Sequence, residues 1–254
     1  MYPGGKGSVF QKIINLIPPH HTYIESHVGG GSVLDAKRPA TLNIGVDLSL
    51  RALEALHQRL PGVIVTNGEM DVHDHLAKKS EPAPEATPEI AIPARYLWVK
   101  QDAVDFLKAY PYTGHEFVYC DPPYPFETRT SKRPIYQFEY THADHVRLLA
   151  CLRTLPCLVM VSSYWSSLYA DTLHAWHTYT YKATKRNGKQ ADEWLWMNYS
   201  QPTRLHDYQY LGDNFRQRER INRIKTRWGK RLKKMSILEQ QAILSEMQAQ
   251  GFID

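Results

Sequence analysis

Long apolar runs are absent from this sequence of 254 residues. No stretch of about eighteen consecutive apolar residues occurs, which excludes a membrane-spanning helix of the usual kind. Residues 1–20 also lack the pattern of a secretory signal peptide. We therefore expect a soluble protein that is not secreted.

Cysteine is scarce as well. The three cysteines, Cys120, Cys151 and Cys157, are odd in number and lie in apolar stretches, so we interpret them as buried free thiols in a reducing compartment. The twelve histidines include close pairs, but none has the thiols or carboxylates that accompany a metal site. No metal centre is expected.

Charge is distributed unevenly. Residues 214–235 contain ten basic side chains and one acid, a net charge of +9 on a chain whose total is +5. Apolar residues recur there at helical spacing, which predicts a cationic helix with one apolar face. A solvated helix docked on the body by that face is one interpretation. Contact with nucleic-acid phosphates is the favoured one, through Arg223, Arg227, Lys230 and Arg231.

Short apolar segments alternate with amphipathic ones through the first two thirds of the chain. This pattern predicts a parallel, doubly wound sheet. We expect helices at 9–17, 51–60 and 142–152, and strands at 22–25, 42–47, 63–66, 96–99, 117–120 and 158–162.

The last third of the chain has a different pattern. Strands are expected at 176–182 and 193–199, separated by Asn187-Gly188, a strong hairpin signal. Their aromatic residues Trp194, Trp196 and Tyr199 suit a core better than base stacking. Ser236 and Glu239 have capping-box spacing and predict a final helix that reaches Met247.

The tetrapeptide Asp121-Pro122-Pro123-Tyr124 is the most informative stretch, because it follows the expected strand 117–120 directly. The two prolines exclude a helix and fix the backbone. A carboxylate and a proline carbonyl can both accept hydrogen bonds from an exocyclic amine, and a tyrosine ring can stack on the base that carries it. A proline-rich turn after a core strand is the plainer alternative.

A second pattern lies upstream. The strand 22–25 leads into Gly29-Gly30-Gly31, and the strand 42–47 ends in Asp47. Missing side chains let a ligand approach the backbone, and an acid at this distance can bind ribose hydroxyls. Leu34 stands where a dinucleotide fingerprint needs its third glycine, so a nucleoside without a pyrophosphate fits better.

Four blocks in a fixed order carry a resemblance: Tyr2 to Lys6, Glu25 to Gly31, Asp47, and Asp121 to Tyr124. This order resembles the Dam-type, class alpha, DNA adenine-N6 methyltransferases, over residues 2 to about 200. Where this chain has Ser26-His27, that family usually has Pro-Phe. The implied fold is α/β: a Rossmann-like methyltransferase sheet with a C-terminal antiparallel hairpin, here followed by a basic helical tail.

The resemblance implies S-adenosylmethionine as the cofactor. The family's cofactor-binding positions correspond here to Tyr2, Gly5, Lys6, Glu25, His27, Gly29, Gly31 and Asp47. Asp102, which follows the strand 96–99, is our candidate for a hydrogen bond to the cofactor's adenine. Asp71 is the competing choice.

The implied reaction is methyl transfer to N6 of adenine. Asp121 and the Pro122 carbonyl would bind both amino protons, and Tyr124 would stack on the extruded base. No metal or covalent intermediate is required, and no Pro-Cys nucleophile for cytosine C5 chemistry is present. Amino-cytosine (N4) methylation, RNA adenine methylation and a non-catalytic nucleic-acid-binding role remain as alternatives.

The expected organisation is a catalytic domain over 1–205 and a basic extension over 206–254. Residues 79–94 predict a proline-rich linker. Residues 125–140 predict a DNA-contacting loop that contains Arg129, Lys132 and Arg133, although a surface loop with incidental charge explains them equally well. The resemblance implies double-stranded DNA as the partner, with no membrane, in the cytoplasm of a bacterium or phage-infected cell.

Sequence recognition has little room in this chain. The family's recognition domain normally lies between the third cofactor block and the catalytic tetrapeptide. Only eighteen residues separate Asp102 from Asp121, and the sheet itself needs a helix and a strand there. Relaxed or very short sequence specificity is therefore expected.

Overall fold

The protein is described from a computed structural model, in which residues 5–66, 94–129, 133–184, 188 and 190–252 are placed. The chain divides into two compact units, Met1–Asp207 and Tyr208–Asp254. His206 and Asp207 belong to the first unit because they bond to its body: the His206 N–H donates to the carbonyl of Ile17, and Asp207 accepts from the Arg38 N–H. The division thus lies two residues after the boundary expected from the sequence.

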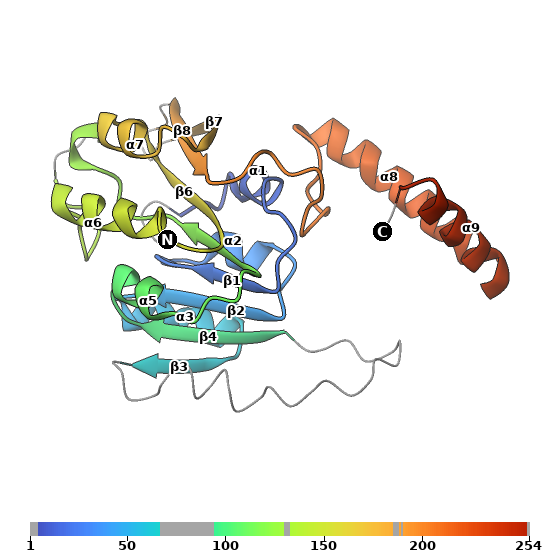
Figure 1. Ribbon diagram of the computed structural model, residues 1–254, viewed down its shortest axis with the longest axis horizontal. Coiled ribbons are helices and arrows are strands. Elements are labelled where there is room, and N and C mark those ends of the chain that lie inside the picture. The colour runs from blue at the N-terminus through green and yellow to red at the C-terminus, as the bar shows by residue number, and fades with distance from the viewer. Residues whose placement is uncertain (1–4, 67–93, 130–132, 185–187, 189, 253–254) are drawn as a thin grey trace. The chain divides into compact units, whose positions relative to one another are not determined.

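One sheet forms the centre of the first unit (Figure 1). Among the described residues it has eight strands in the order β3-β4-β2-β1-β5-β6-β8-β7. The strands β1 to β6 pair in parallel, and β8 pairs antiparallel with both β6 and β7. Their bounds are β1 Thr22–Glu25, β2 Leu42–Asp47, β3 Val63–Thr66, β4 Arg95–Lys100, β5 Glu116–Cys120, β6 Leu158–Tyr164, β7 His177–Thr184 and β8 Gln190–Met197.

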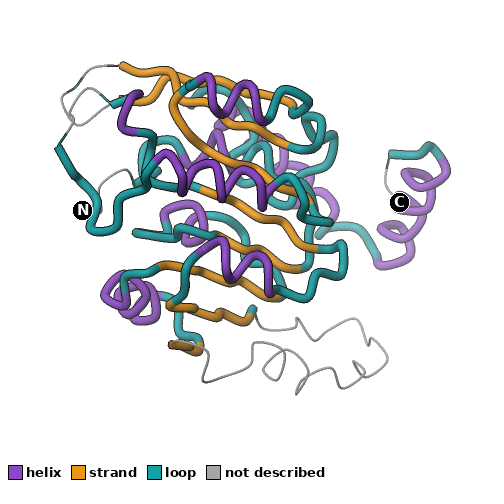
Figure 2. Tube along the Cα trace, turned by 60° about the vertical axis from the view of Figure 1, so that its left-hand side comes forward, coloured by secondary structure: helices purple, strands orange, loops and turns teal. Residues whose placement is uncertain are grey.

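The helices that connect successive strands in the sequence pack against the faces of the sheet (Figure 2). The chain moves outward from β1 to β2 and later from β5 to β6, in opposite directions across the sheet. Right-handed crossovers therefore put the helices of the two halves on opposite faces. The helices α1 Phe10–Ile14, α2 Ser32–Ala36 and α3 Leu50–Arg59 belong to the first half, and α5 Ala103–Ala109, α6 His142–Leu152 and α7 Ser167–Thr172 to the second.

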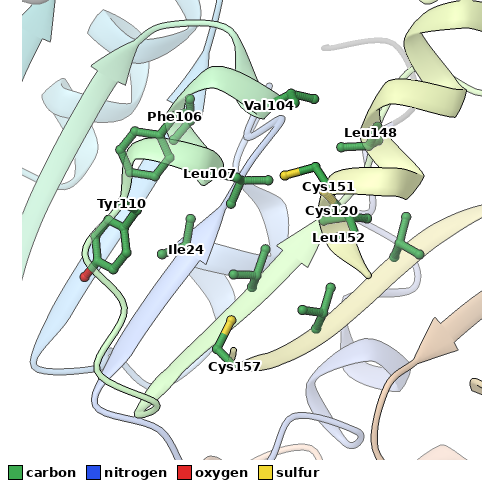
Figure 3. Packing of buried hydrophobic residues seen from close by; sticks show 14 of the residues in the cluster. Ile24, Val104, Phe106, Leu107, Tyr110, Cys120, Leu148, Cys151, Leu152 and Cys157 are labelled. Carbon is green, nitrogen blue, oxygen red and sulfur yellow. The ribbon is translucent and has the colours of Figure 1, made fainter. Parts of the chain in front are cut away.

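A hydrophobic core lies between the sheet and the helices α5 and α6 (Figure 3). Ile24 and Cys120 contribute from neighbouring strands, and Leu107 and Leu148 from the two helices. Cys120, Cys151 and Cys157 are all buried free thiols in this part of the molecule. The interpretation of the cysteines as buried, unpaired residues is therefore confirmed.

The α/β fold expected from the sequence is confirmed, and several elements have the predicted bounds: β1, β2, β3 and α6. The first helix ends at Ile14 instead of residue 17, since Ile17 precedes Pro18 and a residue before proline avoids the helical region. The strand β6 continues to Tyr164, two residues beyond the prediction. The hairpin β7–β8 forms, with Gly188 at a positive φ of 78° in its turn.

The second unit contains two helices among its described residues, α8 Phe215–Leu232 and α9 Ile237–Ala249. The expected capping box is present, because the Ser236 side chain accepts from the Glu239 N–H and Glu239 accepts from the Ser236 N–H. No residue of α8 is buried, so its apolar face is not docked within this unit. None of the described helices is long and apolar enough to cross a membrane.

Candidate active site

A cleft opens at the carboxyl edge of the parallel strands. The empty space in and in front of this cleft, open solvent included, is about 780 Å³. The ends of β1, β2 and β5 and the segments that follow them supply much of its wall. Of the expected cofactor residues, these line the cleft: Gly5, Lys6, Glu25, His27, Gly29, Gly31 and Asp47.

The glycine segment forms one side of this cleft. Gly31 has a φ of +64°, and a Cβ atom there would lie 2.5 Å from Cδ2 of the buried Leu56. Gly31 is also the N-cap of α2, so a short helix does begin at this point. Glycine is therefore required for both the backbone conformation and the space.

Asp47 fixes the other side of the glycine segment. Its Oδ2 accepts a hydrogen bond of 2.8 Å from the Gly29 N–H, and its Oδ1 accepts one of 2.8 Å from the Ser49 N–H. Burial raises the pKa of this carboxyl group, although these N–H donors oppose the rise. The Leu48 N–H also bonds to this carboxylate. Since a carboxylate has about four acceptor positions, Asp47 can still accept a hydroxyl group from a ligand in the cleft.

Glu25 is a buried acid at the end of β1. The Tyr23 hydroxyl donates to its Oε2 at 2.8 Å. Burial is the main reason why the pKa of Glu25 rises to about 8, and the nearby Asp121 raises it further. A cationic ligand in the cleft would favour its ionised form.

His27 stands where the resembling family has phenylalanine. Its Nε2 lies 2.7 Å from the hydroxyl of Tyr140, and the two rings meet edge to face at 5.2 Å. Burial lowers the pKa of His27 to about 3, so the ring is neutral. Tyr136, Phe138 and Tyr140 all line the cleft. The loop expected to contact DNA thus also forms a wall of the cofactor cleft.

Asp121 lies at the carboxyl end of β5, where the strand delivers it to the cleft. The Lys6 ammonium donates to both of its oxygens, at 2.6 and 2.7 Å, and to the Tyr124 hydroxyl at 2.7 Å. Burial alone would lower the pKa of Lys6, but Asp121 and then Glu193 outweigh it and hold that pKa well above its usual value. Burial raises the pKa of Asp121, and Lys6 opposes this.

The Tyr124 ring is only 6% exposed. Its hydroxyl lies 2.9 Å from Oγ of Ser162, and its ring meets the Tyr164 ring edge to face at 4.6 Å. Stacking on an extruded base would require this ring to be uncovered. Pro123 lines the cleft, and Trp165, one residue beyond β6, is 53% exposed.

Glu193 is a buried acid of the site that sequence reasoning missed. Its Oε2 lies 3.9 Å from the Lys6 nitrogen and accepts a hydrogen bond of 2.7 Å from the Tyr181 hydroxyl. The local sign is weak: of the two acids in the aromatic strand β8, Glu193 is the one whose side chain lies on the face shared by Leu195 and Met197. Nothing nearby in the sequence points to Lys6.

Asp102 does not occupy the predicted position. Its Oδ1 accepts from the N–H groups of Val104 and Asp105, so it is the N-cap of α5, and it pairs with Arg147. The residues on either side of it, Gln101 and Ala103, line the cleft instead. The expected hydrogen bond from Asp102 to the cofactor's adenine is therefore not supported.

Arg129 is also placed differently from the prediction. Its side chain is 6% exposed and pairs with Glu139 at 2.7 Å, and its Nε donates to the Tyr124 carbonyl at 2.6 Å. Arg129 thus holds the tetrapeptide and its loop together. The DNA contact expected of it is wrong, because a buried guanidinium that is paired with a carboxylate does not reach the phosphates outside.

The other predicted DNA contacts lie in two places. Arg133 is exposed in the first unit, and Arg223, Arg227, Lys230 and Arg231 are exposed on α8 in the second. Four residues named from the sequence are outside the described part of the chain: Tyr2, Asp71, Lys132 and Asn187. The expected linker 79–94 lies outside it as well, except for residue 94.

Several solved structures are similar to this chain over most of its length. A conserved hypothetical protein from Streptococcus pyogenes is 12% identical with a TM-score of 0.45, covering 80% of this chain and 100% of its own. A magnesium protoporphyrin IX methyltransferase from Synechocystis PCC 6803, with bound S-adenosylmethionine, is 11% identical with a TM-score of 0.41, covering 75% of this chain and 74% of its own. A putative RNA methyltransferase from Pyrococcus horikoshii is 13% identical with a TM-score of 0.43, covering 78% of this chain and 86% of its own. At these scores none of them bears on function, and no curated protein matches the chain.

A family model matches the chain itself. Residues 98–190 match that of the D12 class N6 adenine-specific DNA methyltransferases. The matched segment runs from β4 to the start of β8 and includes Asp121 to Tyr124. S-adenosylmethionine is the cofactor of this family, as the sequence predicted. The resemblance to the DNA adenine-N6 methyltransferases is thus confirmed over residues 98–190.

Proposed function

We propose that this enzyme transfers a methyl group from S-adenosylmethionine to N6 of adenine in double-stranded DNA. The observation that carries the proposal is the position of Asp121-Pro122-Pro123-Tyr124 beside the cleft that Glu25, the glycine segment and Asp47 also line. Asp121, the first of the amino acceptors, and the cofactor residues thus open on one space. The family match includes this tetrapeptide.

The amino group of adenine is a poor nucleophile, because its lone pair is delocalised into the ring. Asp121 and the Pro122 carbonyl are hydrogen-bond acceptors, and binding both amino protons would localise that lone pair. S-adenosylmethionine supplies an electrophilic methyl group when it is bound. The protein's contribution is mainly to position the amino group and to stabilise its developing charge.

The cofactor residues divide by chemistry. Glu25 would face the positive charge of the methionine portion, and the bare backbone of Gly29 and Gly31 would let that portion approach. Asp47 would bind the ribose through its remaining acceptor capacity. Gln101 and Ala103 replace Asp102 as neighbours for the adenine ring, since they line the cleft and Asp102 does not.

DNA would approach at the mouth of this cleft. Arg133 can contact the phosphate backbone there, and the exposed Phe138 and Trp165 offer aromatic faces to unpaired bases. The charge of α8 would add affinity without sequence preference. In this proposal the first unit, up to Asp207, is the catalytic domain and the second is a DNA-binding extension.

The test is identification of the product. The pure protein is incubated with labelled S-adenosylmethionine and with double-stranded DNA, single-stranded DNA or RNA, and the digested nucleosides are analysed by mass spectrometry. We expect N6-methyladenine, chiefly from double-stranded DNA. N4-methylcytosine as the product, or methylated adenine from RNA alone, would overturn the proposal.

The matched control is Asp121→Ala. It removes an interaction that acts in the transition state, so turnover should fall by roughly two or more orders of magnitude, with cofactor affinity kept within a few-fold. Near-normal turnover in that variant would exclude Asp121 from the reaction.

A further inference from the structure

We propose that Glu193 is a positioning residue, which receives the Lys6 ammonium when the amino group of the substrate base occupies Asp121. This inference rests on the proposed function. It assigns to the C-terminal hairpin a part in the reaction beyond closing the sheet.

The starting point is a conflict at Asp121. Its two oxygens both accept from Lys6, at 2.6 and 2.7 Å. A base that donates an amino proton to Asp121 therefore competes with Lys6 for the carboxylate. The ammonium must give up at least one of these bonds before the base can be held.

If Lys6 leaves Asp121, its ammonium group needs another partner. Its side chain is 4% exposed, and an unpaired ammonium in such a place is costly. The Tyr124 hydroxyl, at 2.7 Å, can stay bonded but carries no opposite charge. A second carboxylate within reach would let the ammonium change partners while its charge stays paired.

Glu193 meets this requirement. Its Oε2 lies 3.9 Å from the Lys6 nitrogen, so a shift of roughly 1 Å would make a full hydrogen bond. Its side chain is 10% exposed. The hydroxyl of Tyr181 donates to the same oxygen at 2.7 Å, which fixes the carboxylate and leaves it a lone pair for Lys6.

The sheet topology explains why Glu193 reaches the site. Because β8 runs antiparallel to β6, its first half lies at the edge where the parallel strands end. Glu193 pairs in register with Tyr164 on β6 and with Tyr181 on β7. Tyr164 in turn contacts the Tyr124 ring, so the hairpin is joined to the tetrapeptide through packed side chains.

In the exchange the donors and acceptors balance. One N–H of Lys6 leaves Asp121 for Glu193, and one N–H of the base takes its place on Asp121. When the methylated base leaves, the ammonium returns. Glu193 therefore acts through Lys6 and does not touch the base.

The test compares two variants of Glu193 that separate charge from shape. Glu193→Gln keeps the size of the side chain and an acceptor for Tyr181 but removes the charge. Glu193→Asp keeps the charge but shortens the side chain. If Glu193 receives Lys6, the Gln variant should lose about tenfold or more in kcat/KM for DNA, and the Asp variant should retain more activity than the Gln variant.

A purely structural role predicts the reverse order, because the isosteric Gln would preserve packing better than Asp. That order, or unchanged kcat/KM in the Gln variant, would overturn the inference. Thermal unfolding midpoints show whether each variant is folded, and affinity for S-adenosylmethionine alone, by calorimetry, should stay within about twofold in both, since Glu193 does not line the cleft.

A second readout does not depend on turnover. DNA with 2-aminopurine next to the target adenine reports extrusion of that adenine by fluorescence, while the adenine keeps the amino group that Asp121 would bind. The Gln variant should show weaker extrusion than the wild type, because Lys6 then stays on Asp121, and equal extrusion would contradict the exchange. Asp192→Asn is the matched control: Asp192 precedes Glu193 on β8 but is half exposed and pairs with Lys182, so this substitution should change neither readout.

The two proposals fail in different ways. The proposed function fails if the wild type forms no N6-methyladenine in DNA. The inference on Glu193 fails if the wild type does form it but the Gln and Asp variants rank in the structural order.

Discussion

At the scale of single residues, the site is distinguished by polar side chains that are buried. Lys6 is 4% exposed and contacts Asp121 and Tyr124, with Glu193 slightly further away. Hydrogen bonds are stronger in such surroundings, and an unpaired member costs more than it would at the surface. Conservative substitutions in this group should therefore have large effects.

Tyr124→Phe tests this directly. A role in base stacking alone predicts a mild effect, since the ring is kept. The hydroxyl, however, accepts from Lys6 and contacts Ser162, so removing it should lower the free energy of unfolding by about 1–3 kcal/mol and reduce turnover clearly. Urea unfolding and kcat measure the two effects.

The control is Tyr179→Phe, in the half-buried tyrosine of the outermost strand, which should behave like the wild type. If Tyr124→Phe matches this control in both stability and turnover, the hydroxyl has no role and stacking alone explains the tyrosine.

Glu25 should make cofactor binding depend on pH. Burial, with a further contribution from Asp121, raises its pKa from 4.5 to about 8 in the free protein, so it is mostly protonated at neutral pH. A positive ligand beside it would lower that pKa and release the proton. Affinity for S-adenosylmethionine should then rise with pH and level off near pH 8.

Calorimetry in two buffers of different ionisation enthalpy measures the released proton. Glu25→Gln should weaken binding and abolish the release. Proton release that persists in this variant would assign it to another group. The same raised pKa means that the contribution of Glu25 to stability is complete below about pH 4.5 and is lost as the pH rises through 8.

At the scale of elements, the turn between β1 and α2 shows how closely the backbone must follow the cofactor cleft. Gly31→Ala would place a Cβ atom 2.5 Å from Leu56 at a φ of +64°. We expect a decrease of about 1–3 kcal/mol in stability and weaker binding of S-adenosylmethionine. Urea unfolding and calorimetry measure these.

Gly114→Ala serves as the control. Gly114 has a φ of +87° but nothing within 4 Å of its added Cβ, and it does not line the cleft. This variant should show the backbone strain while its cofactor affinity stays at the wild-type value. Equal cofactor affinity in both variants would exclude a cofactor role for the Gly31 turn.

Sequence recognition also belongs to this scale. Between Asp102 and Asp121 the structure contains the helix α5, a short connection and the strand β5, all of which belong to the sheet's own framework. No recognition domain is inserted there. We therefore predict relaxed or very short specificity, and sequencing of methylated random DNA should show at most a few preferred bases. A single motif of four or more fixed bases would contradict this.

The elements that could be predicted are those determined by residues close to one another in the sequence. The strands β1 to β3 are short apolar runs, and α6 begins at a capping box of Thr141 and Asp144, so neighbouring residues determine them. The cofactor edge follows from the parallel order of the strands. These parts of the fold and of the cleft were accessible from the sequence.

The charged residues whose roles were predicted wrongly or missed have partners that are distant in the sequence. Asp102 pairs with Arg147 and also caps the start of its own helix. Arg129 is buried, where it pairs with Glu139 and donates to the Tyr124 carbonyl. Glu193 lies near Lys6, which is close to the opposite end of the first unit's sequence. Tertiary packing brings such partners together, and no local sequence pattern indicates them.

At the scale of the whole molecule, the cleft and the most cationic segment lie in different units. The second unit carries the strongly cationic helix α8, none of whose residues is buried. Its side chains include apolar ones, such as Trp228, which is 50% exposed and lies under the Arg231 guanidinium at 5.4 Å. A surface of this composition suits a polyanion, with exposed arginines that can meet phosphates.

Neutralising Arg223, Arg227, Lys230 and Arg231 together, each to Gln, tests this assignment. DNA binding should weaken to a similar degree for all sequences, because phosphate contacts carry no sequence information. The slope of log affinity against log salt should flatten by about one unit for each phosphate that the variant no longer binds. Affinity for S-adenosylmethionine should be unchanged, since none of these residues lines the cleft. The control neutralises two exposed arginines of the first unit, Arg51 and Arg153. If the fourfold variant keeps the wild-type salt slope, α8 does not contact the DNA backbone, and its charge is only that of a solvated helix.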